Sequence, residues 1–121
     1  MEVLLDTNFI ISCVKRKIDF LAQLEENGFK VILPTQVFQE LKDLRFKVSH
    51  EDRTAIKFAL DILIKNKVKK ASLGGSNVDE GLITLGKKGA YVATLDSAIK
   101  RAVPRRVGIS QSQQKIIIEQ D

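Results

Sequence analysis

The chain has 121 residues, the size of one ordinary domain, and this is enough to build a core without disulfides or metal staples. Its composition, 44% hydrophobic and 29% charged, argues against disorder over most of the chain. No apolar run is long enough for a membrane helix, the N-terminus lacks the cationic start of a secretory signal, and the single cysteine excludes an internal disulfide. We therefore expect one domain over residues 1–121, located in the cytoplasm.

The net charge of +5 is unevenly distributed. Residues 65–106 carry ten basic and three acidic side chains, whereas residues 1–64 carry nine basic and ten acidic ones. A basic second half suits a partner with a phosphate backbone. Lysines solvated at helix ends and turns explain the same charge equally well.

The chain alternates between short apolar runs and amphipathic helical patterns. In chain order, the pattern predicts a strand at 2–5, helices at 9–14 and 20–27, a strand at 30–33, helices capped by Thr35 and Ser49, a strand at 68–73 ending at Gly74-Gly75-Ser76-Asn77, a helix at 78–88, a strand at 90–94, a helix at 96–103 and a strand at 107–110. A last apolar run, 116–118, is either a strand or part of a tail. This alternation predicts an α/β fold with parallel strands and helices on both faces of an open sheet.

Three aspartates lie where such a sheet binds ligands, outside the carboxyl ends of its strands. Asp6 directly follows the first strand, and Asp96 follows the strand at 90–94. Asp79 lies in the first turn of the helix after the glycine-containing turn. Parallel strands would bring all three to one edge of the sheet.

A fourth acid, Glu40, lies on the helix capped by Thr35. At 100° per residue it falls about 65° from the centre of that helix's apolar stripe, which places it at the edge of the buried face. Asp43 falls about 130° from the same centre, toward solvent. A carboxylate against an apolar face needs a partner, so Glu40 joins the candidates.

Each acid has a simpler explanation when it is considered alone. The three aspartates suit helix caps or first turns, and Glu40 suits a surface position. Four carboxylates at one edge, however, repel one another unless cations lie between them. A hard divalent cation with oxygen ligands, Mg²⁺ or Mn²⁺, is the natural occupant.

These residues resemble the motifs of PIN-domain ribonucleases. The matching motifs are, in order, Asp6-Thr7-Asn8, Glu40-Leu41, Asp79 at a helix start and Thr94-Leu95-Asp96 after a strand. The stretch 91–96, with the residues that follow it up to Pro104, is most similar to PIN endonucleases of ribosomal-RNA processing and their archaeal relatives, and less similar to the PIN toxins of toxin–antitoxin pairs. The resemblance implies a three-layer α/β/α sandwich with a mainly parallel sheet. It also implies metal-dependent endonuclease activity on RNA.

By motif position, the resemblance assigns the catalytic and metal-binding roles to Asp6, Glu40, Asp79 and Asp96. It makes Thr7, Asn8 and Thr94 the supporting polar neighbours. The candidates for contact with the RNA backbone are the basic side chains of the second half, Lys87, Lys88, Lys100, Arg101, Arg105 and Arg106. Besides RNA, the partners left open are a second copy of the chain, ribosome-assembly factors and an antitoxin. One position departs from the processing enzymes: Ala98 stands where they usually carry another acid, which weakens a second metal site or the activity.

Several other interpretations fit the sequence less well. A phospho-acceptor receiver domain needs adjacent acids after its first strand, where Asp6 stands alone. A PIN scaffold that binds RNA or protein without cutting would not need all four acids, but Ala98 keeps this alternative open, and a toxin of a toxin–antitoxin pair would share the same chemistry. The run Gly81–Lys87 mimics a nucleotide-binding P-loop but is followed by Lys88 and lies within a helix. Cys13 and His50 have no local signal of a catalytic pair.

Overall fold

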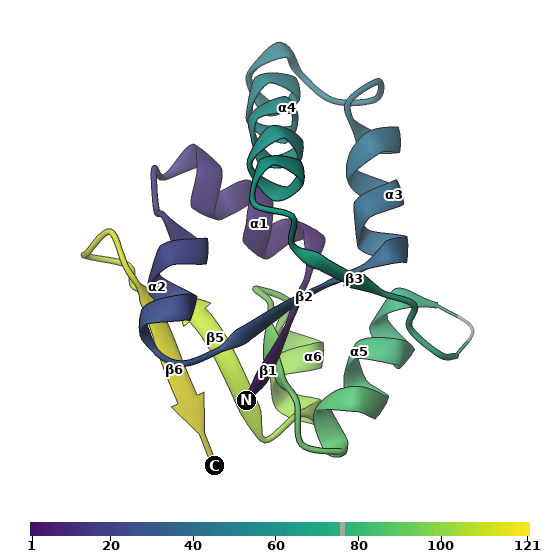
Figure 1. Cartoon of the computed structure of the whole chain (residues 1–121), viewed down its shortest axis with the longest axis vertical. Helices are drawn as coiled ribbons and strands as arrows, with labels where there is room; N and C mark the ends of the chain where they lie inside the picture. The colour runs from purple at the N-terminus through teal and green to yellow at the C-terminus, as the bar shows by residue number, and fades with distance from the viewer. Residues whose placement is uncertain (76) are drawn as a thin grey trace.

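The computed structural model describes residues 1–75 and 77–121, so Ser76 of the predicted 74–77 turn lies outside the described residues. The strands are β1 (Glu2–Leu5), β2 (Lys30–Pro34), β3 (Lys69–Ala71), β4 (Tyr91–Ala93), β5 (Arg105–Ile109) and β6 (Ile116–Gln120). The helices are α1 (Thr7–Lys15), α2 (Phe20–Glu26), α3 (Thr35–Leu44), α4 (His50–Lys65), α5 (Val78–Lys87) and α6 (Ser97–Ala102) (Figure 1).

All these strands form one sheet in the order β3-β2-β1-β4-β5-β6. The first five pair in parallel, and β6 pairs antiparallel with β5. The chain first builds outward from β1 to β2 and β3, and then crosses back to place β4 on the other side of β1. The strand order therefore reverses between β1 and β4, and this is the place where open α/β sheets form their binding crevice.

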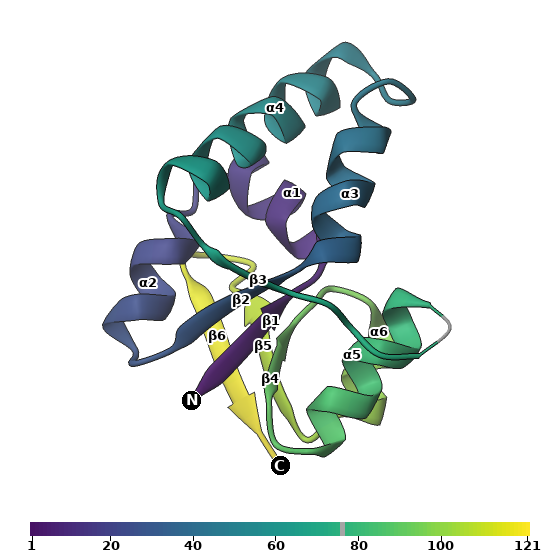
Figure 2. The ribbon, with the colours of Figure 1, turned by 45° about the vertical axis from the view of Figure 1, so that its right-hand side comes forward.

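Helices cover both faces of the sheet, as predicted from the sequence. Side chains alternate along β1, so Val3 and Leu5 join the core beneath α1, α2, α3 and α4, whereas Leu4 joins a second core beneath α5 and α6. Figure 2 shows α1, α3 and α4 together on one side of the sheet, with α5 and α6 on the other. The fold is therefore the three-layer α/β/α sandwich expected above.

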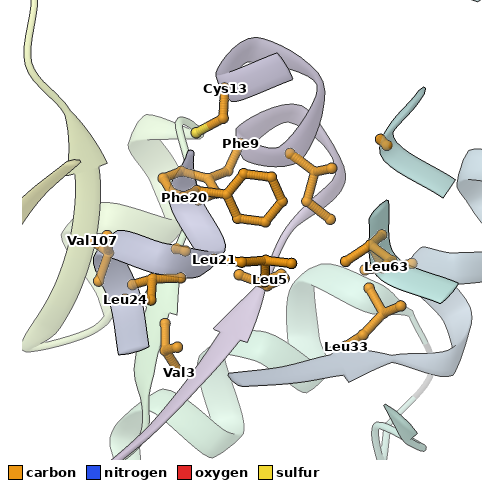
Figure 3. Close-up of a cluster of buried hydrophobic side chains, with 14 of the residues drawn as sticks. Val3, Leu5, Phe9, Cys13, Phe20, Leu21, Leu24, Leu33, Leu63 and Val107 are labelled. Atoms are coloured by element: carbon orange, nitrogen blue, oxygen red, sulfur yellow. The ribbon is translucent and has the colours of Figure 1, made fainter. Parts of the chain in front are cut away.

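The larger core contains an edge-to-face aromatic pair next to the end of β1. Phe9 of α1 and Phe20 of α2 meet edge to face with ring centroids 6.0 Å apart, above Leu5 of β1 (Figure 3). Edge-to-face packing adds to the gain from burying the rings. This contact packs α1 against the core next to the end of β1. It therefore helps to fix the position of Asp6, which joins β1 to α1 in the sequence.

The structure changes two details of the sequence interpretation. Thr35 is the first residue of α3 and not its cap; Pro34 holds the cap position, with no side-chain hydrogen bond there. The last apolar run is a strand, because β6 adds to β5 and is held by the backbone of that neighbour. Among the described residues, no helix combines the length and apolar character needed to cross a membrane.

Gly86 lies in α5 with no room for a side chain. An added Cβ would meet the Val103 Cγ1 at 2.5 Å and the Val92 Cγ2 at 3.1 Å. We expect Gly86→Ala to lower the free energy of unfolding by about 1–3 kcal/mol, because overpacking outweighs the helix propensity of alanine. Urea denaturation measures this change.

The matched control is Gly74→Ala, where an added Cβ meets nothing within 4 Å. A Gly86→Ala variant more stable than the wild type would show that propensity outweighs packing at this position.

Candidate active site

Asp6 is a buried acid held by two hydrogen bonds. It directly follows β1, caps α1, and is only 7% exposed. Its Oδ1 accepts from the Thr7 amide at 2.9 Å, and its Oδ2 accepts from the Thr94 hydroxyl at 2.7 Å. Both carboxylate oxygens therefore have a donor, and the side chain has one orientation.

Burial raises the pKa of the Asp6 carboxyl above its ordinary value, because desolvation penalises the charged form. The hydrogen bonds from Thr94 and Thr7 oppose this rise. The charges of Asp79 and Glu40 add to it, in that order. Two acids from other elements, Glu40 of α3 and Asp79 of α5, thus lie within electrostatic reach of Asp6.

Thr94 links Asp6 to Asp96. It is fully buried at the end of β4; its hydroxyl donates to Asp6 and accepts from the Asp96 amide at 3.1 Å. Asp96 is half-buried and caps α6, with its Oδ1 accepting from the Ile99 amide at 3.0 Å. Asn8 accepts from the Leu95 amide at 3.3 Å, so the turn after β4 is tied to α1 at a second point.

Glu40 and Asp79 are both exposed side chains. The prediction that Glu40 lies at the edge of the buried face is therefore wrong. The buried residues of α3 are Val37 and Leu41, and Glu40 lies outside the face that they form. Asp79 lies in the first turn of α5, as expected, behind the cap residue Asn77. Both acids act on Asp6 through charge and not through contact.

The donor set suits a hard divalent cation, although the acids do not converge on one point. Among the described residues, no three His, Cys, Asp or Glu side chains form a group that could hold an ion. Mg²⁺ retains several waters and needs only one or two protein carboxylates. The buried Thr7 Oγ1 has no hydrogen-bond partner and sits beside Asp6, where a water or an ion's hydration shell would satisfy it. The residues present therefore fit such an ion.

Most of the basic candidates lie away from these acids. Lys87 and Lys88 precede β4, and Arg105 and Arg106 begin β5, so these four side chains lie at the amino end of the parallel strands. Arg106 is also paired with Asp121 at 2.8 Å. Lys100 and Arg101 lie in the last turn of α6, the helix that Asp96 caps.

Cys13 is not a nucleophile. It is fully buried in α1, and desolvation raises the pKa of its thiol to about 12. His50 is exposed at the start of α4. The run 81–87 is the body of α5, which also excludes a P-loop there.

Gln36 was missed by the sequence interpretation. Its side chain makes two hydrogen bonds to the backbone of Leu73, which follows β3. No spacing or composition signal points to this contact, because its partner is a main-chain segment 37 residues away.

The fold is that of a PIN domain: residues 3–115 match the family model described as a PIN like domain, and the chain belongs to that family. By sequence it is similar to Ribonuclease VapC9 of Archaeoglobus fulgidus, with 29% identity over 119 residues that cover 94% of this chain and 86% of that protein. By structure it is similar to the PIN domain endonuclease Utp24, with a TM-score of 0.77 and 22% identity over 99% of this chain and 92% of that one. The family resemblance and the fold predicted from the sequence are confirmed.

We expect Asp6→Asn to raise the free energy of unfolding at pH 7. Asparagine removes a buried, repelled charge and still caps a helix well. The folded-state pKa of Asp6 lies above its ordinary value of 3.8, so wild-type stability falls as pH rises through that interval. The gain in the variant is therefore present above the raised pKa and disappears as pH falls below 3.8.

Urea denaturation at pH 7 measures the gain in stability, and the same experiment at low pH measures its loss. Asp19→Asn, at the exposed cap of α2, is the matched control. A stability gain that is independent of pH would contradict the electrostatic origin.

Proposed function

We propose that this chain is a divalent-metal-dependent endoribonuclease that hydrolyses RNA phosphodiester bonds, in the processing of ribosomal or other RNA in the cytoplasm. The observation that supports this most is Asp6, which is buried at the strand-order reversal and oriented by Thr7 and Thr94. Its pKa is raised by burial first and then by the charges of two further acids. In this proposal residues 1–121 are one PIN-like domain, and Mg²⁺ or Mn²⁺ is the cofactor.

Asp6 and Asp96 would hold the cation, with Glu40 and Asp79 completing its surroundings. When bound, the ion supplies activation of water and charge neutralisation at the phosphodiester. Thr94 keeps the two strand-end acids in a fixed relation, because its hydroxyl contacts both residues. Thr7 Oγ1 offers a free hydroxyl next to Asp6 for a water molecule. Asn8 holds the turn that carries Asp96.

RNA would be recognised mainly by shape and by its phosphates. The chain has six Phe, one Tyr and no Trp, and its most buried phenylalanines belong to the core. Lys100 and Arg101 lie nearest in sequence to Asp96, whereas the other basic candidates suit RNA that extends around the sheet. A second copy of the chain and ribosome-assembly factors remain the proposed protein partners.

A toxin of a toxin–antitoxin pair is the second candidate. The likeness to Ribonuclease VapC9 favours it, and the chemistry would be the same. In that case the protein partner would be an antitoxin. Ala98, exposed on α6 where processing enzymes usually carry an acid, is compatible with a single metal or with a scaffold that does not cut.

We expect the purified protein to cut a labelled structured RNA with Mn²⁺ or Mg²⁺ and not with EDTA. Asp6→Asn and Asp96→Asn should each lower the cleavage rate by more than about 100-fold, because each removes a charged ligand of the ion. Gel analysis of the cleavage products measures the rates.

Asp43→Asn, on the same helix as Glu40 but outside the acid group, is the control with unchanged rate. Full activity in Asp6→Asn would contradict the site. Absence of cleavage by a wild type that binds Mn²⁺ would favour the scaffold.

The salt dependence of RNA binding tests the basic residues. Replacing Lys100 and Arg101 with alanine should reduce the slope of log K against log salt by about 1 for each lost phosphate contact. Filter binding over a salt series measures the slope. Lys87→Ala with Lys88→Ala is the comparison at the opposite end of the sheet, and identical slopes for the Lys100/Arg101 variant and the wild type would remove that pair from the RNA path.

A further inference from the structure

The side-chain amide of Gln36 binds the chain after β3, mainly at the backbone of Leu73 and with a longer contact of 3.5 Å to the Ser72 hydroxyl. Its Nε2 donates to the Leu73 carbonyl at 3.0 Å, and its Oε1 accepts from the Leu73 amide at 3.1 Å. This is the pair of bonds that a neighbouring strand would make to Leu73. Gln36 lies in the first turn of α3, so the amide joins α3 to the segment that leads into α5.

Leu73 in turn sets the position of α5. It is buried in the smaller core with Leu82. A Cβ added at Gly81 would lie 2.8 Å from the Leu73 Cβ and 2.8 Å from the Gly74 carbonyl oxygen, so α5 rests directly on the segment that Gln36 holds. Asp79 is two residues before Gly81 on the same helix.

The two elements joined in this way each carry an acid whose charge acts on Asp6. Glu40 lies one helical turn after Gln36 on α3, and Asp79 lies at the start of α5. Both charges repel the Asp6 carboxylate, so without a cation they favour movement of α3 and α5 away from it. Two hydrogen bonds from a neutral amide oppose that movement and add no charge to the site.

We propose that Gln36 is a positioning residue of the active site: by holding Leu73 it keeps Asp79 within reach of the cation that Asp6 and Glu40 attract. This inference rests on the proposed function, since it assumes that these acids share a divalent ion. Gln36 itself touches neither the ion nor the RNA.

The test is Mn²⁺ binding, followed by the EPR signal of the free ion, in a double-mutant cycle of Gln36 and Asp79. Gln36→Ala should weaken Mn²⁺ binding by about tenfold, the usual effect of removing an outer-shell partner. Asp79→Asn should also weaken binding. Adding Gln36→Ala to Asp79→Asn should change nothing further, because the amide acts through Asp79.

Two variants separate positioning from general loss of structure. Gln36→Met keeps the length of the side chain without its hydrogen bonds and should weaken binding as Gln36→Ala does. Gln39→Ala removes an amide on the same helix that contacts only Asp43, and it should bind Mn²⁺ like the wild type.

Equal Mn²⁺ affinity in the wild type and Gln36→Ala would overturn the inference. The same loss in the Asp79→Asn background would overturn it as well, because the effect would then not pass through Asp79. A wild type that binds Mn²⁺ but cuts no RNA would overturn the proposed nuclease and leave the positioning role standing. A wild type that binds no Mn²⁺ would overturn both.

Discussion

The carboxylate of Asp6 is almost completely buried at the end of the central strand, and a buried charge persists only where its surroundings compensate for it. The compensation comes from two donors on different elements, the first amide of α1 and the hydroxyl after β4. These donors meet because β4 returns to the side of β1 opposite β2. The Phe9–Phe20 contact holds α1 over that point. The topology and the packing of the core thus fix the position of the Asp6 carboxylate.

The fold was largely predictable because its signals are local. Apolar runs and caps mark the elements, and the cap side chains of Asp6, Ser49 and Asp96 bond as their positions suggest. The same aspartates therefore satisfy the simple structural explanation and the proposed functional one at once. A cap position and a ligand position coincide at the carboxyl end of a strand, so sequence alone could not separate the two roles.

The parts that sequence missed depend on contacts between distant segments. The hydrogen bond from Thr94 to Asp6 spans 88 residues, and the strand order that creates it leaves no local trace. The wheel estimate for Glu40 failed because the apolar stripe of α3 is narrower in the fold than its sequence suggests, with Leu44 only half-buried. The basic residues of the second half of the sequence form one group along the chain. In the fold, Lys87, Lys88, Arg105 and Arg106 lie at the amino end of the parallel strands, whereas Lys100 and Arg101 lie on α6.

Neutral amide side chains join distant segments at several places in this fold, and two of them, Gln23 and Gln36, both donate to and accept from the backbone. Gln23 of α2 donates to the Gln114 carbonyl at 3.2 Å and accepts from the Ile116 amide at 2.8 Å, so it takes the place of a strand beside β6. Gln36 makes the equivalent pair of bonds beside β3. A charged side chain could replace neither amide, because an ammonium or guanidinium group only donates and an ionised carboxylate only accepts. Beside the acids a basic side chain would also offset their negative charge, and another acid would add to the repulsion. An uncharged side chain that both donates and accepts is the one solution that strengthens the frame and leaves the field of the acids unchanged.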